Sequence, residues 1–259
     1  MAHPESVHSE VKPKILYFGT PVVLISTENA DGSFNLAPVS SAWALGHSIV
    51  LGLGEDGHTL SNLRSRPGLT INYPEPHLWE AVERLASLTG ANPVPKTKPA
   101  QTTYRADKFA AAGLSQQSSV GVRPPRVKEC GVQLEAKVSG ISPSASGEFA
   151  IVECGVEKVH VRQSLVIPGT QHIDPGRWEP LIYNFRHYFG LASPTVRKRR
   201  AGASSRTGTS SLTGASRRSF SQTSQLPLPA GMPHNQSCDS RIPRCFRRAL
   251  PGAVRDSGP

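Results

Sequence analysis

The chain has 259 residues and carries 29 Lys and Arg against 19 Asp and Glu, for a formal net charge of +10. Residues 1–190 hold 17 basic and 17 acidic side chains, whereas residues 191–259 hold 12 basic and 2 acidic ones, so the whole excess lies in the tail. The basic balance therefore gives no reason to assign the first 190 residues to nucleic-acid or membrane binding. A neutral segment of that size can bury one hydrophobic core without disulfides or metals.

The sequence gives no sign of export or of metal binding. Its N-terminus, MAHPESVHSEVKPK, lacks the apolar stretch of a signal peptide, and no apolar run approaches the roughly 20 residues that span a bilayer. The four cysteines form no CxxC pair, and the histidines show no ligand spacing. We expect a soluble, cytoplasmic protein without a metal site.

The first part of the chain predicts short antiparallel strands. Residues 22–27 (VVLIST) form a β-branched run, and residues 29–32 (NADG) are a hairpin turn signal before a return strand over 33–41. Pro38 cannot donate to a ladder, so this return strand should lie at a sheet edge or contain a bulge. Two more strands are expected at 48–53 and 69–73, separated by one helical turn over 59–63 with Thr59 as its N-cap.

Two helices and a second group of strands follow. Leu78, Val82, Leu85 and Ala86 have helical spacing, which predicts an amphipathic helix between Pro76 and Gly90. A shorter helix is expected over 106–112, closed by Gly113. The β pattern resumes at 132–138, 149–161 and 165–167.

Residues 177–190 (RWEPLIYNFRHYFG) are rich in aromatic residues and histidine. Such a cluster belongs either in a core or beside a planar ligand, and its composition fits both. From about Ser193 the chain becomes Arg/Ser-rich and loses periodicity, so we expect residues 191–259 to be disordered and residues 1–13 to be a flexible N-terminus. Two origins of this tail stay open: a basic arm that binds nucleic acid, and the product of a shifted reading frame.

The chain contains no GxSxG, HExxH or P-loop motif, and the glycine-rich run over 51–57 (LGLGEDG), which has GxGxxG spacing, is interpreted as a strand end and turn. Instead, small polar residues gather at the predicted strand ends: Asn35, Ser40, Ser41, Thr59, Asn62 and Asn72. Because Pro38 interrupts the ladder beside them, backbone groups there need other partners, which an amide-rich planar ligand could provide. The start of the turn at Thr59 could hold a phosphate through backbone N–H groups. Ordinary turn chemistry also explains the same residues, since Asn and Ser are common in hairpins.

The order and spacing of several segments resemble the flavin reductase-like, FMN-binding split-barrel family, and its flavoredoxin-like branch in particular. The segments are 17–27 (YFGTPVVLIST), 31–32 (DG), 35–41 (NLAPVSS), 59–63 (TLSNL), 71–72 (IN), 107–109 (DKF) and 129–135 (ECGVQLE). The resemblance covers about residues 14–190, and the tail has no counterpart in it.

This resemblance implies a mainly β fold: a six-stranded antiparallel split barrel with peripheral helices over residues 14–190. It also implies a homodimer with FMN at the subunit interface, to which the aromatic residues 178–189 could contribute apolar area. The implied activity is hydride transfer from NADH or NADPH to flavin, in which the cofactor supplies the chemistry and no catalytic side chain is assigned. An FMN carrier or electron-transfer protein without reductase turnover remains an alternative, as does nucleic-acid binding through the tail.

Carried over by position, the resemblance also implies the contacts of the cofactor. Asn35, Ala37, Pro38, Ser40 and Ser41 would face the flavin ring or ribityl chain, Thr59 and Asn62 would hold the phosphate, Asn72 would lie near the flavin, and Lys96 or Lys98 would add a phosphate contact.

Overall fold

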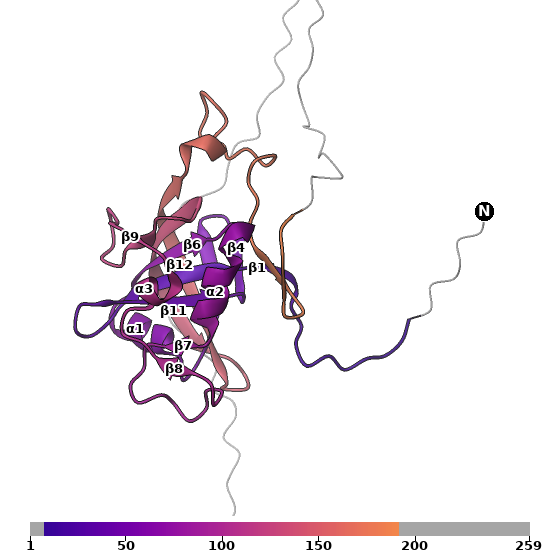
Figure 1. Ribbon diagram of the computed structural model, residues 1–259, viewed down its shortest axis with the longest axis vertical. Coiled ribbons are helices and arrows are strands. Elements are labelled where there is room, and N and C mark those ends of the chain that lie inside the picture. The colour runs from indigo at the N-terminus through magenta and orange to yellow at the C-terminus, as the bar shows by residue number, and fades with distance from the viewer. Residues whose placement is uncertain (1–7, 192–259) are drawn as a thin grey trace, which may run out of the picture. The chain divides into compact units, whose positions relative to one another are not determined.

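The computed structural model describes residues 8–191, and Figure 1 traces their path. All described residues belong to one compact unit, which lies within Met1–Arg200. The predicted disordered tail, apart from Leu191, and the first seven residues lie outside the described part. Residues 8–17 contain no helix or strand.

The described strands are β1 (Phe18–Pro21), β2 (Val23–Glu28), β3 (Phe34–Val39), β4 (Ala42–Leu45), β5 (Ser48–Gly54), β6 (Gly68–Tyr73), β7 (Leu88–Thr89), β8 (Thr103–Tyr104), β9 (Gln116–Gln117), β10 (Arg126–Val127), β11 (Val132–Pro143), β12 (Phe149–Val161), β13 (Ile182–Asn184) and β14 (His187–Phe189). The helices are α1 (His58–Ser65), α2 (Trp79–Ala86) and α3 (Lys108–Ala112), with short 3-10 turns at Pro76–Leu78 and Gln163–Leu165.

Seven strands form one antiparallel sheet in the order β3-β2-β6-β11-β12-β5-β4. Its two edge strands, β3 and β4, are separated in the chain by only Ser40 and Ser41, so the two edges must meet. At that point the Gly52 backbone N–H donates to the Ser41 carbonyl at 2.8 Å. The sheet is thus a barrel that is split where β3 passes into β4, which confirms the predicted antiparallel split barrel with peripheral helices.

The sequence did not predict the seventh strand, β4, because its AWAL segment is short and does not alternate in polarity. The position expected for Pro38 is confirmed. Strand β3 pairs only with β2, and Pro38 lies opposite Leu24, so no second neighbour requires the N–H that proline lacks.

Two apolar clusters lie on opposite sides of the barrel wall. Val23 and Ile25 of β2 point into the barrel, whereas Leu24 and Leu36 point outwards, where α2 and α3 cover them. Both faces of β2 are therefore buried, and each such aliphatic side chain contributes about 1.5–3 kcal/mol. Phe109 of α3 belongs to the outer cluster.

The helices differ from prediction at one point that bears on the site. Helix α1 begins at His58, so Thr59 lies inside its first turn and Gly57 occupies the N-cap without a side-chain hydrogen bond. The predicted role of Thr59 as N-cap is therefore wrong. Helix α3 follows prediction: Asp107 accepts from the Ala110 backbone N–H at 3.0 Å, and Gly113 closes the helix with φ +70°.

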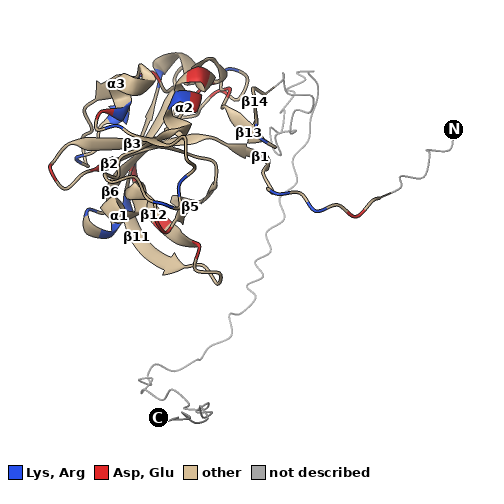
Figure 2. Ribbon diagram, turned by 60° about the horizontal axis from the view of Figure 1, so that its bottom comes forward, with Lys and Arg blue, Asp and Glu red and all other residues tan. Residues whose placement is uncertain are grey.

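The C-terminal strands β13 and β14 form a second small sheet with the N-terminal strand β1, in the order β1-β13-β14, next to helix α2 (Figure 2). The aromatic residues of 177–190 divide between two environments. Trp178 packs on the barrel core, whereas Phe189 remains 49% exposed. The strand predicted at 165–167 is wrong, because Leu165 ends a 3-10 turn and only Val166 makes an isolated bridge, with Ile173. No helix among residues 8–191 is long and apolar enough to cross a membrane.

Candidate functional site

A cavity of about 260 Å³ opens where the barrel is split. It is lined by Tyr17, Ala37, Pro38, Val39, Ser40, Ser41, Gly52, Leu53, Gly54, Gly57, Thr59, Leu60 and Lys98. Five of the predicted cofactor residues therefore come together here: Ala37, Pro38, Ser40, Ser41 and Thr59. The end of β3 and the β3–β4 connection supply four of them, and the start of helix α1 supplies the fifth.

Close packing shapes the cavity at Ser41. The Tyr17 hydroxyl is 2.8 Å from the Ser41 hydroxyl, which ties the segment before β1 to the barrel split. On the other side, a Cβ atom at Gly52 would lie 3.1 Å from the Ser41 Cβ, a distance tighter than most carbon contacts. Glycine at position 52 therefore permits the close approach of β5 to the β3–β4 connection.

Behind the cavity, a chain of hydrogen bonds links Thr59 to a buried lysine. The Asn35 amide donates to Thr59 Oγ1 at 3.1 Å, and Asn35 Oδ1 accepts from Lys108 Nζ at 3.4 Å. Because Thr59 Oγ1 accepts the Asn35 proton, its own hydroxyl proton is free to donate elsewhere. Asn35 is 1% exposed, so it supports the cavity through Thr59 and does not line it.

Lys108 is 3% exposed, and no carboxylate among residues 8–191 forms an ion pair with it. Burial, and secondly the positive charge of Lys98, lower the pKa of Lys108 to about 8. A buried ammonium group without a counter-charge is costly unless an anion binds close by. The positive charges of Lys98 and Lys108 thus favour an anionic ligand at the start of α1.

A second hydrogen-bond network fixes α1 to the β2–β3 hairpin. Asn62 donates to Thr27 Oγ1 at 3.0 Å and to Asn29 Oδ1 at 2.8 Å, and His58 Nε2 lies 2.9 Å from the same Asn29 oxygen. Burial, followed by the charges of Lys108 and Arg66, lowers the pKa of His58. Its imidazole is therefore neutral near pH 7 and serves to position the hairpin.

Three predicted site residues lie elsewhere. Both amide protons of Asn62 are used in this network, and it does not line the cavity. Asn72 is fully buried; its amide donates to the Leu24 carbonyl and to Thr70, and its oxygen accepts from the Val127 N–H. Lys96 is exposed and does not line the cavity, whereas Lys98 does. These placements favour structural roles for Asn62 and Asn72, and Lys98 as the lysine of the site.

Sequence reasoning assigned no role to Tyr17, Gly52 or Lys108. Tyr17 and Lys108 stand within segments that carry the family resemblance, YFGTP and DKF, so a signal was present for both. Nothing in the sequence, however, places the start of α3 beside Thr59, because that contact depends on how α3 packs on β3. Gly52 looks like an ordinary residue of a strand.

Comparisons with known proteins agree with this fold. The model of the "Flavin reductase like domain" family matches residues 15–192. An uncharacterized protein of Bacillus subtilis strain 168, YdfE, is 47% identical over 184 residues, which are 70% of this chain and 88% of that protein.

Two solved structures show the same fold at low identity. Flavoredoxin of Desulfovibrio vulgaris (Miyazaki F) is 20% identical with a TM-score of 0.63, over 75% of this chain and 99% of that one. Component B of nitrilotriacetate monooxygenase from Bacillus cereus is 16% identical with a TM-score of 0.60, over 74% of this chain and 100% of that one.

Proposed function

Because this chain belongs to the flavin reductase-like domain family, we propose that it is an FMN-binding oxidoreductase that passes reducing equivalents from NADH or NADPH through the bound flavin. The observation that carries the proposal is the uncompensated positive charge at the barrel split. Lys98 lines the cavity, and Lys108 is buried behind Thr59 without a carboxylate partner in the described chain.

The residues present fit the phosphate of a mononucleotide. The first turn of α1 has no acidic residue and no side-chain cap, so its backbone N–H groups are open to an anion. The Thr59 hydroxyl can donate to the same group, and Lys98 can neutralise its charge. Because this site suits a terminal phosphate monoester, we expect FMN to bind more tightly than FAD.

The β3–β4 connection fits the remainder of the cofactor. Ser40 and Ser41 offer hydroxyl and backbone groups at the break in the ladder, next to Pro38. When bound, the flavin supplies the hydride-transfer chemistry, so the chain needs to hold and orient it and requires no general base.

We also propose a homodimer, in which the outer face of β4, β5 and β12 forms the interface. The strand register places Trp43, Leu45, Phe149 and Ile151 on this face, and each is more than 40% exposed. Ser41 and Gly52 of the cavity lie beside it. A cavity of about 260 Å³ is below the usual size for a ligand as large as FMN, so a second subunit would help to cover the cofactor.

Absorbance and turnover test the proposal in two steps. The purified full-length protein, titrated with FMN, should give a flavin absorbance band near about 450 nm that co-elutes with the protein. Oxidation of NADH or NADPH with free flavin as acceptor then separates a reductase from a carrier. FMN binding without NAD(P)H oxidation would favour the carrier, and failure to bind FMN would contradict both.

A further inference from the structure

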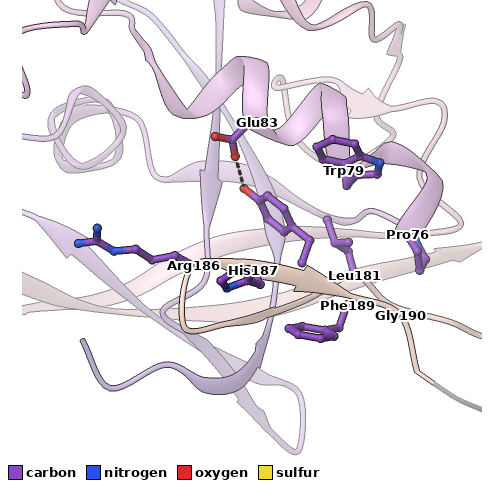
Figure 3. Close-up of a pocket in the computed structure, with 9 residues that line it drawn as sticks. Pro76, Trp79, Glu83, Leu181, Arg186, His187, Phe189 and Gly190 are labelled. Atoms are coloured by element: carbon purple, nitrogen blue, oxygen red, sulfur yellow. Dashed lines mark hydrogen bonds between the residues drawn. The ribbon is translucent and has the colours of Figure 1, made fainter. Parts of the chain in front are cut away.

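A second hollow lies away from the barrel split and shares no residue with the cavity there. It has a volume of about 550 Å³ and lies between helix α2 and the β13–β14 hairpin (Figure 3). We call it the aromatic hollow, because Trp79, Tyr188 and Phe189 line it. Binding in this hollow does not depend on whether the chain binds flavin.

One end of the aromatic hollow is apolar. Figure 3 shows Trp79 and Phe189 on either side of Leu181, with Pro76 next to them. Trp79 is 47% exposed and Phe189 is 49% exposed, although Leu181 at the base is buried. Two half-exposed rings above an apolar floor form a slot that favours a planar aromatic group.

The other end is polar and carries an unpaired cation. The Tyr188 hydroxyl donates to Glu83 at 3.0 Å, as the dashed line in Figure 3 marks. Burial, followed by the Glu83 carboxylate, raises the pKa of Tyr188, so the phenol keeps its proton and Glu83 keeps its partner. Within residues 8–191, by contrast, Arg186 forms neither an ion pair nor a side-chain hydrogen bond, although it lines the same hollow.

The backbone holds Arg186 at this position against its conformational preference. The two-residue turn between β13 and β14 has φ +45° at Phe185 and +67° at Arg186, where Gly or Asn would be relaxed. Packing explains the position of Phe185, because the centroid of its ring lies 4.7 Å from that of the Phe18 ring in an edge-to-face arrangement. Arg186 has no such ring contact and is exposed at the rim of the hollow, so its guanidinium is available to a ligand there.

We propose that the aromatic hollow binds a small planar aromatic anion, with its ring between Trp79 and Phe189 and its anionic group at Arg186. Both a simple aromatic acid and a nucleotide monophosphate have this chemistry. The tail of the chain has the wrong charge for the role, because residues 191–259 carry 12 basic and only 2 acidic side chains.

Calorimetric titration of the full-length protein tests the proposal with four probes: 2-naphthoate, its neutral amide 2-naphthamide, the cation 2-naphthylmethylammonium, and 5′-AMP. Phe189→Ala removes one wall of the slot, and Arg186→Asn removes the charge while keeping a residue that tolerates positive φ. Tyr104→Ala and Arg105→Asn are matched controls, since both are exposed and neither lines the hollow.

We expect 2-naphthoate to bind more tightly than the amide or the cation. Phe189→Ala should weaken naphthoate binding about tenfold, and Arg186→Asn should do so as well, while leaving the amide unchanged. Competition by 5′-AMP with the same dependence on Arg186 identifies nucleotides as the source of the anion, and no competition identifies simple aromatic acids. Absence of binding by both anions, equal effects in the control variants, or tighter binding of the cation overturns the proposal.

Discussion

Lys108 Nζ lies 3.4 Å from Asn35 Oδ1, and the amide group of the same Asn35 donates to Thr59 Oγ1 at 3.1 Å. Asn35 thus links a buried ammonium group, through two hydrogen bonds, to a hydroxyl on the wall of the barrel-split cavity. The pair brings together segments far apart in the chain, the start of α3 and strand β3. The positive charge of Lys108 has no ion-pair partner among the described acidic residues, so this lysine is the first residue to test.

Replacing Lys108 by Met should weaken FMN binding by about 1–3 kcal/mol, the range for losing an interaction with a charged group. The variant should fold, because Met fills a similar volume and removes a costly buried charge. Equilibrium titration with FMN measures the affinity, and circular dichroism reports the fold. Lys128→Met is the matched control, since Lys128 is exposed and does not line the barrel-split cavity; an equal loss there would contradict a specific role for Lys108.

The same lysine predicts a pH dependence of stability. Its pKa falls from 10.5 to about 8 on folding, so between these values the unfolded chain binds more protons than the folded chain. Its contribution to the unfolding free energy therefore rises with pH across that window, by up to roughly 3 kcal/mol. Below about pH 8 the folded protein carries the full cost of burying the charged Lys108 side chain.

Urea unfolding of the FMN-free wild type and of Lys108→Met, from pH 7 to pH 10.5, isolates this contribution from the tyrosines that also titrate. The variant should be the more stable at pH 7, and the difference should shrink towards pH 10.5. A difference that stays constant with pH would show that Lys108 is not desolvated.

Substitutions at Thr59 distinguish a role in FMN binding from a role in the fold. Thr59→Val keeps the shape and removes the hydroxyl, so FMN affinity should fall by roughly 1–3 kcal/mol, whereas Thr59→Ser should retain most of it. The fold should survive with a loss of about 1 kcal/mol, because the Asn35 amide loses one of its two acceptors, keeping Thr27 Oγ1, and α1 loses no cap. Titration with FMN and urea unfolding measure the two effects. If Thr59→Val unfolds the protein while FMN affinity per folded molecule is unchanged, Thr59 is structural.

Local sequence patterns predict the antiparallel strands around the site, whereas the split barrel itself was implied by the family resemblance. The run VVLIST, the NADG turn and the position of Pro38 are short-range signals, and they predict an edge strand that the structure confirms. Ala37, Pro38, Ser40 and Ser41 belong to this same stretch, and the resemblance assigned all four to the flavin by position; the structure brings them together at one cavity.

The remainder depends on packing between distant segments. Asn62 and Asn72 have the residue type of ligand contacts, yet tertiary partners use their amides, and no sequence pattern shows whether an amide is already satisfied. Lys96 and Lys98 differ by two positions in a proline-rich loop without a regular pattern, so only the structure distinguishes them. Lys108 was missed because lysine is rarely buried, and its burial arises where α3 packs on β3.

Two substitutions distinguish the proposed dimer interface on β4, β5 and β12 from an interface formed by the aromatic segment 178–189. Trp43→Glu places a charge on the outer face of β4, β5 and β12 and should give a monomer at micromolar concentration, since a central aromatic side chain contributes about 2 kcal/mol or more. FMN affinity should fall with it. Light scattering measures the mass. Phe189→Glu is the control on the aromatic segment 178–189: a monomer in that variant alone would restore this segment as the interface.

Deletion of residues 193–259 tests the assignment of function to the body of the chain. This deletion removes 12 basic and 2 acidic residues but none of the strands of the barrel, so the melting temperature and the FMN affinity should both be retained. Any binding of the intact chain to DNA or RNA should disappear with the tail. Because such binding would rest on scattered arginines, it should weaken steeply with salt and show no sequence preference.

If the tail is the product of a shifted reading frame, resequencing the gene should replace it by a different C-terminus soon after Gly190. If the deletion unfolds the protein or lowers its FMN affinity, the tail contributes to the folded structure, and the boundary placed at residue 190 is wrong.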